Sequence, residues 1–130
     1  MSDTAKQPAG TLVGFDLTVP AAENVRDFYS SVIGWIPEAA DMGGYSDYFM
    51  KSGDTGQIVA GVCHARGDNA DLPPQWLAYV AVADLDESLR RCLDDGGRLV
   101  TGVKGVEGGR YCVIEDPAGA VLALMQLGES

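Results

Sequence analysis

Few residues of this chain have the types and spacing that chemistry requires. The single histidine, His64, directly follows Cys63, and a thiol beside an imidazole could supply a nucleophile and its base. The segment Gln57 to Cys63 has the composition of a β-strand, and adjacent strand residues point to opposite faces of a sheet. We therefore expect no catalysis from this pair.

A carboxylate stands inside an apolar segment near the N-terminus. Asp16 lies in the run from Leu12 to Val19, which has strand composition and is closed by Pro20. A carboxylate held on a strand could bind a cation or act as a base. It could equally lie near the strand end, solvated or paired with an arginine. The residues leave both interpretations open.

The elements that must position these residues occur twice. The strand 12–19 precedes a helix that ends at Gly34, and a second strand, Trp76 to Val82, precedes a helix that Asp84 caps. Three β-like segments follow each helix: 35–39, 45–51 and 57–63 in the first copy, and 98–103, 110–115 and 121–127 in the second. The first helix carries an apolar stripe made of Val25, Phe28, Tyr29, Val32 and Ile33. The order predicts two βαβββ modules offset by about 63 residues.

The repeat predicts the domain organisation. One amphipathic helix and four strands are too little to close a core alone, so we expect two modules to form a single α+β domain. The predicted domain spans 11–127, with one module at about 11–65 and the other at about 75–127. Residues 1–10 are polar and predict a flexible N-terminal tail. A ferredoxin-like βαββαβ fold would leave one strand per half unexplained.

Composition excludes several classes of partner. The chain has 130 residues, 46% of them hydrophobic, and a formal charge of −10, which is the wrong sign for nucleic acid or an anionic membrane. No apolar run approaches the roughly 20 residues of a membrane span, and the N-terminus does not resemble a signal peptide. We expect a cytoplasmic protein. Three widely spaced cysteines predict reduced thiols.

Local strings in both halves resemble a known family. Three motifs resemble those of the vicinal oxygen chelate superfamily. The first is Phe28-Tyr29 followed by Gly34-Trp35, and the second is the string 76–79, which begins with Trp76. The third is Asp116-Pro117-x-Gly119, directly before the last strand. This superfamily holds glyoxalase I, extradiol dioxygenases and bleomycin-resistance proteins, and the glyoxalase-like group is the most similar. The resemblance implies a rolled mixed sheet with a concave cleft, helices outside, and a homodimer.

The same resemblance argues against a metal centre. Members with metal chemistry supply ligands at positions that fall here on Gly14, Leu77, Ala123 and, less firmly, near Gly61. None of these side chains can hold a metal, so we expect no cofactor. A shifted register that recruits Asp16, His64 or Gln126 would restore a divalent metal, and with it the alternative of a metal-dependent lyase, isomerase or dioxygenase.

Strand alternation then predicts the residues of the cleft. If Gly14 faces the cleft, so does Asp16, and the repeat places five residues of the second half there: Leu77, Tyr79, Val121, Ala123 and Met125. Such a lining suits a small, largely apolar or aromatic molecule, and the acidic balance favours a cation. Sequestration of this molecule needs no catalytic residue. A non-catalytic interaction module is the remaining alternative.

Overall fold

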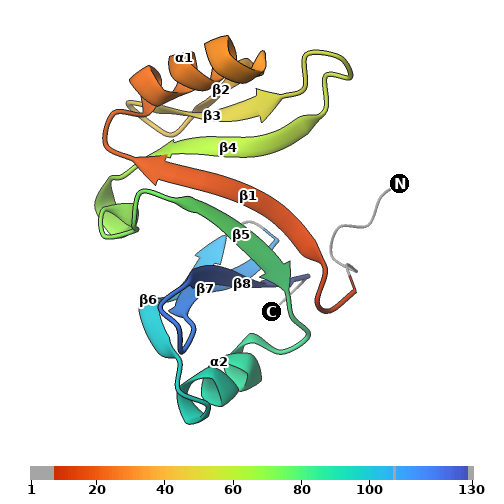
Figure 1. Cartoon of the computed structure of the whole chain (residues 1–130), viewed down its shortest axis with the longest axis vertical. Coiled ribbons are helices and arrows are strands. Elements are labelled where there is room, and N and C mark those ends of the chain that lie inside the picture. Colours follow the sequence, from red (N-terminus) through yellow and green to blue (C-terminus); the bar gives the residue numbers. More distant parts are fainter. Residues whose placement is uncertain (1–7, 107, 129–130) are drawn as a thin grey trace. The chain divides into compact units, whose positions relative to one another are not determined.

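The computed structural model describes residues 8–106 and 108–128 and shows the predicted order of elements twice (Figure 1). The first copy contains β1 (Leu12–Val19), α1 (Ala22–Ile33), β2 (Ile36–Asp41), β3 (Ser46–Lys51) and β4 (Ile58–His64). The second contains β5 (Trp76–Ala81), α2 (Leu85–Asp94), β6 (Arg98–Val106), β7 (Gly109–Glu115) and β8 (Val121–Leu127), after a short 3₁₀ helix, η2 (Gly67–Asn69). Residues 1–7 of the predicted tail lie outside the described residues.

The chain divides into two compact units. The α1 unit comprises residues 15–76, and the α2 unit comprises residues 8–14 together with 77–128. In the α1 unit, β2–β3 and β3–β4 are antiparallel and β4–β1 is parallel. In the α2 unit, β6–β7 and β7–β8 are antiparallel and β8–β5 is parallel. Eight strands in mixed pairings with two helices confirm the predicted α+β class, and four strands per copy exclude the ferredoxin-like alternative.

The core of the α1 unit lies between α1 and one face of its strands. Leu17 and Val19 of β1 are buried there with Ala22 of the helix. The remaining buried members come from β3 and β4: Tyr48, Met50, Ala60 and Val62. Because side chains alternate along a strand, Asp16 and Thr18 point to the face opposite α1.

The apolar stripe predicted for α1 is only partly buried, which corrects the expectation of a continuous core face. Val25 and Tyr29 pack against the core, in line with Ala22 at spacings of three and four residues. Phe28 and Val32 lie on a neighbouring line of the helix surface and are 56% and 63% exposed. Ile33, in the last turn, is 51% exposed. Gly34 ends the helix as predicted, in the left-handed conformation with φ of 87°.

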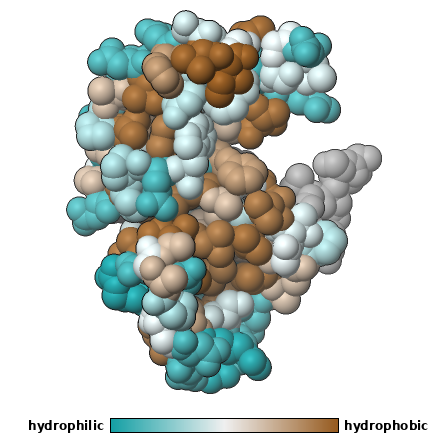
Figure 2. All heavy atoms as spheres, viewed as in Figure 1, coloured by the Kyte–Doolittle hydropathy of each residue, from teal (hydrophilic) through white to brown (hydrophobic). Residues whose placement is uncertain are grey.

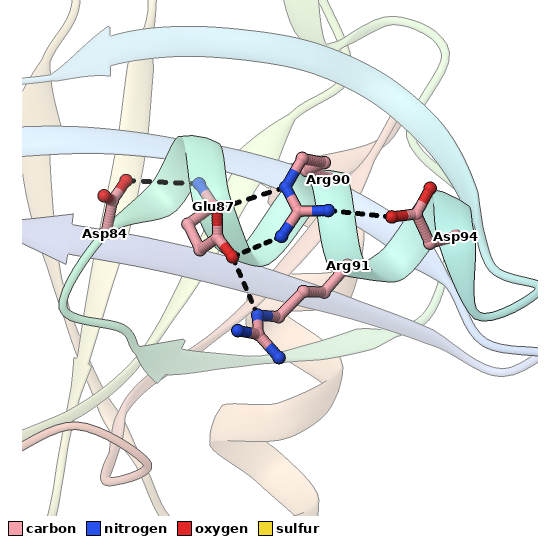
Figure 3. A network of polar contacts seen from close by, with 5 residues as sticks. All are labelled: Asp84, Glu87, Arg90, Arg91 and Asp94. Carbon is pink, nitrogen blue, oxygen red and sulfur yellow. Dashed lines mark hydrogen bonds and ion pairs between the residues drawn. The ribbon is translucent and has the colours of Figure 1, made fainter.

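In the α2 unit the helix packs on β7 and β8 through Leu85, Cys112 and Leu124. The Asp84 carboxylate accepts a hydrogen bond from the Glu87 N–H at 3.1 Å, which confirms the predicted cap (Figure 3). Two acidic side chains of α2, Glu87 and Asp94, pair with arginines of the same helix. These pairs follow the three- and four-residue spacing of a helix surface.

Strand ends shift slightly from their predicted positions. The largest change is in β6, which continues to Val106, because Lys104, Gly105 and Val106 pair with β7 across a hairpin. All three cysteines are free thiols, as predicted. None of the helices in the described part of the chain is long and apolar enough to span a membrane.

Candidate functional site

Asp16 has a defined position on the α1 unit. It is half-buried and pairs with Gly61 in the parallel ladder between β1 and β4. A Cβ atom at Gly61 would collide with the Asp16 carboxylate and would lie 3.9 Å from the Cys63 Sγ. The carboxylate therefore occupies the space above Gly61, on the face opposite α1, and only a residue without a side chain leaves room for it.

The thiol beside this carboxylate is held in its protonated form. Burial raises the pKa of the Cys63 thiol, and the negative charges of Asp16 and Asp47 raise it further. A hydrogen bond from the thiol to the Asp47 carboxylate acts in the same direction. Because the thiolate is the nucleophilic form, Cys63 is unsuited to covalent catalysis.

His64 points to the opposite side of β4. Its Nε2 lies 3.0 Å from Glu23 Oε2 of α1, and its Nδ1 lies 3.4 Å from Asp47 Oδ1. The Asp47 carboxylate also accepts the His64 backbone N–H at 2.8 Å. A backbone hydrogen bond, and then the bond to His64, lower the pKa of Glu23. Cys63 and His64 therefore form no dyad, as strand alternation predicts.

The predicted site residues of the α2 unit lie on one face of β5 and β8. Tyr79 pairs with Ala123 and Ala81 with Met125, which places these side chains in the same alternation as Leu77 and Val121. Leu77, Tyr79 and Ala123 are buried, whereas Val121 and Met125 are half-buried. The Tyr79 ring lies 5.7 Å from that of Tyr111 on β7. On β5 and β8 this face is thus apolar apart from the Tyr79 hydroxyl, and Tyr111 of β7 adds a second phenol ring.

The donor atoms at hand do not fit a metal centre. Gly14, Gly61, Leu77 and Ala123 offer no ligating side chain, and in residues 8–106 and 108–128 no three His, Cys, Asp or Glu side chains are grouped to hold an ion. The shifted register finds no support, since Asp16 and His64 point to opposite faces of the α1 unit. The Gln126 Oε1 accepts hydrogen bonds from the Leu85 N–H at 2.7 Å and from Arg110 at 3.3 Å.

An apolar hollow of about 180 Å³ lies in the α1 unit. It is lined by Phe15, Trp35, Val59, Ala60 and Trp76. Ala60, Trp35 and Trp76 belong to the core under α1, so the hollow and the Asp16 carboxylate are on different faces of the strands. The sequence analysis did not predict this hollow.

Two contacts at the Asp16 site were not predicted from the sequence. Gly61 was named only as a loosely aligned ligand position, and its contact with Asp16 was not foreseen. A glycine inside an apolar strand often marks a close approach of another group, so that signal was available. Asp47 could not be found in the same way, because its contact with Cys63 and His64 depends on the register between β3 and β4.

Two repeated βαβββ halves define an α+β protein of the glyoxalase type of fold. Residues 11–124 match the model of the glyoxalase/bleomycin resistance protein/dioxygenase superfamily, and the chain belongs to this superfamily. It is 30% identical over 132 residues to the anthracycline biosynthesis protein DnrV of Streptomyces peucetius, covering 92% of this chain and 48% of DnrV. The chain spans about half the length of the curated relatives it matches.

Solved structures agree on the fold. A member of the same superfamily from Vibrio splendidus superposes with a TM-score of 0.55 at 13% identity, over 88% of this chain and 98% of that one. A methylmalonyl-CoA epimerase from Mycobacterium tuberculosis gives a TM-score of 0.50 at 19% identity, over 98% and 97% of the two chains. At these identities the likeness concerns the fold alone.

Proposed function

We propose that this protein binds a small, largely apolar or aromatic molecule that carries a positive charge, and that it does so without a metal ion. The observation that carries the proposal is the Asp16 carboxylate, seated above Gly61 on the strand face opposite α1. A fixed carboxylate on a strand face provides a countercharge for a cation. The net charge of −10 adds a long-range attraction for the same kind of ligand.

On the α2 unit, the predicted residues form a separate apolar face, which supports an apolar class of ligand by itself. Val121 and Met125 are half-buried on this face, beside Tyr79. Leu77 and Ala123 are buried on the same face. The similarity to an anthracycline biosynthesis protein favours an aromatic ligand, since anthracyclines are polycyclic aromatic compounds.

The test compares Asp16→Asn with the unmodified protein by calorimetry against a panel of aromatic cations at two salt concentrations. Loss of a hydrogen-bonded charge should weaken binding by about 1.5 to 3 kcal/mol at both concentrations. The matched control is Asp86→Asn with Asp94→Asn, which removes charge from the exposed surface of α2. Salt screens such surface charges beyond roughly 8 Å, so the control should matter little at high salt. Unchanged affinity in Asp16→Asn would rule out this role for Asp16.

Elemental analysis separates this proposal from its metal-dependent alternative. Protein purified from metal-replete cells without chelator should hold no stoichiometric zinc, nickel, iron or manganese. One tightly bound transition metal per chain would favour a lyase, isomerase or dioxygenase with displaced ligands. Absence of binding by every compound in the panel would favour an interaction module.

A further inference from the structure

We infer that Phe49, Gly61 and Asp16 form one subsite for a flat cation with N–H donors, of the arylamidinium class; this inference rests on the proposed function. The three residues come from adjacent strands, β3, β4 and β1. Phe49 pairs with Gly61 across β3–β4, and Gly61 pairs with Asp16 across β4–β1. They therefore stand in one row across the sheet of the α1 unit.

All three residues direct their side-chain positions to the same face. Tyr48 and Met50, on either side of Phe49, are buried in the core under α1, as are Ala60 and Val62 on either side of Gly61. Phe49 consequently points away from α1, and it is 44% exposed. An aromatic ring, a glycine and a carboxylate thus follow one another on the face opposite the helix.

The glycine leaves room for the Asp16 carboxylate to lean over β4 toward Phe49. A Cβ atom at position 61 would collide with this carboxylate, which therefore fills the position over Gly61. Neighbouring strands are about 4.8 Å apart, so the Cα atoms of Phe49 and Asp16 are separated by about 10 Å. Because the carboxylate leans over the strand between them, its charge lies closer to Phe49 than the backbone of Asp16 does.

The chemistry at the two ends of the row selects the ligand. A carboxylate accepts two parallel N–H bonds from an amidinium or a guanidinium, in a geometry that a single ammonium group cannot reproduce. An exposed phenyl ring stacks on an aromatic ring and attracts an adjacent positive charge. A small cation that joins a ring to an amidinium presents both features to Phe49 and Asp16. Benzamidinium is therefore the probe, and neutral benzamide is its match in shape.

The first variant is Gly61→Ala. The added methyl group must displace the Asp16 carboxylate, the movable end of a side chain, so the fold should tolerate it. We expect benzamidinium to bind about tenfold to a hundredfold more weakly, as with Asp16→Asn, and benzamide binding to change much less. Gly14→Ala is the matched control, because a Cβ at Gly14 meets no atom within 4 Å and Gly14 lies in the same alternation on β1 as Asp16.

The second variant is Phe49→Leu, which keeps an apolar side chain but removes the ring. It should weaken the binding of both benzamidinium and benzamide by about twofold to tenfold, because both probes lose the stacking on the Phe49 ring. Phe15→Leu is its control, since Phe15 is similarly exposed, at 43%, but lines the hollow on the α1 side. Circular dichroism of each variant verifies folding.

The results of these variants distinguish a failure of the three-residue subsite from a failure of the proposed function. If Asp16→Asn leaves the affinity for every bound aromatic cation of the panel unchanged, the proposed function fails and the subsite with it. If binding of the panel depends on Asp16 but the unmodified protein does not bind benzamidinium, the subsite alone is wrong. If Asp16→Asn weakens binding while Gly61→Ala and Phe49→Leu match their controls, Asp16 binds the cation but the three-residue subsite is wrong. Selective loss of benzamidinium in Gly61→Ala, together with loss of both probes in Phe49→Leu, would support the inference.

Discussion

The indole N–H of Trp76 donates a hydrogen bond to the hydroxyl oxygen of Tyr29, with 3.1 Å between the two atoms. The two rings meet edge to face, with centroids 5.4 Å apart, and each lies 5.8 Å from the ring of Trp35. One aromatic cluster thus joins Tyr29 of α1, Trp35 directly after the C-cap of that helix, and Trp76 at the start of β5. These are the residues that carried the resemblance in the sequence.

Tyr29→Phe should destabilise the protein by about 1 to 3 kcal/mol, because the partly buried indole N–H of Trp76 loses its acceptor while the ring contacts remain. Urea unfolding followed by tryptophan fluorescence measures the change. Tyr45→Phe serves as the control. The Tyr45 ring contacts the His64 ring and the Arg66 guanidinium, and a phenylalanine ring keeps both contacts. Equal losses in the two variants would contradict a specific role for the Tyr29 hydroxyl.

The cluster shows what the sequence could predict. Periodicity was sufficient to place α1, and composition together with glycine and proline was sufficient to place β1 and the stop at Gly34. The short motifs around Tyr29, Trp35 and Trp76 indicated the family. They did not explain why aromatic residues stand at these three positions. That reason is a contact between residues 47 positions apart, which no local pattern contains.

Burial on α1 was harder to predict for a related reason. An apolar stripe predicts which helix residues could face a core. Which of them are buried depends on how far the strands beneath the helix extend. Val25 and Tyr29 meet that layer and Phe28 does not. Similarly, alternation predicts which face of β1 carries Asp16, but the position of its carboxylate over Gly61 depends on the β1–β4 register, which the sequence alone left undetermined.

The charge network on α2 should make stability depend on pH below 5. Hydrogen bonds from Arg90, and then from Arg91, lower the pKa of the Glu87 carboxyl from its ordinary 4.5 to about 2 (Figure 3). A carboxyl with a lowered pKa in the folded state stabilises the fold above its unfolded-state pKa. That contribution is lost as the pH falls from about 4.5 to about 2.

Glu87→Gln should therefore lower the urea midpoint at pH 7, and the difference from the unmodified protein should vanish near pH 2. The effect is modest, because the network is exposed and solvent screens it. Arg90→Gln provides a second check. It removes the hydrogen bond that contributes most to the lowered Glu87 pKa, so an NMR titration should show that pKa raised. A midpoint difference that persists at pH 2 would show that the variant acts on packing or helix propensity.

Cysteine reactivity reports on the position of Asp16 without any ligand. Burial raises the Cys63 pKa first, and the Asp16 charge raises it second, so Asp16→Asn should lower that pKa and increase the thiolate fraction. Alkylation of Cys63 by iodoacetamide at pH 9, followed by mass spectrometry, should become faster. Cys112 is the internal control, because burial and Cys92, rather than Asp16, raise its pKa to about 11. Faster alkylation of both cysteines would indicate general loosening instead.

The exposed apolar residues of α1 predict self-association. Phe28, Val32 and Ile33 are each more than half exposed, and Figure 2 shows apolar groups among hydrophilic ones in the region of α1 but mainly hydrophilic groups over α2. Contiguous apolar side chains on a surface mark a contact site, and a pair of identical copies related by a two-fold axis is the commonest assembly. We therefore predict a homodimer in which α1 of each copy contributes to the interface.

Light scattering at micromolar concentration should give about twice the chain mass of 13.7 kDa. Val32→Glu places a charge in the middle of the exposed stripe, and burying an unpaired carboxylate is costly enough to shift the protein toward the monomer. Leu93→Glu is the matched control, because Leu93 of α2 is 53% exposed against 63% for Val32. A dimer that survives Val32→Glu but dissociates in Leu93→Glu would move the interface to α2. A single 13.7 kDa species in the unmodified protein would exclude the dimer, and the apolar residues of α1 would then need another partner.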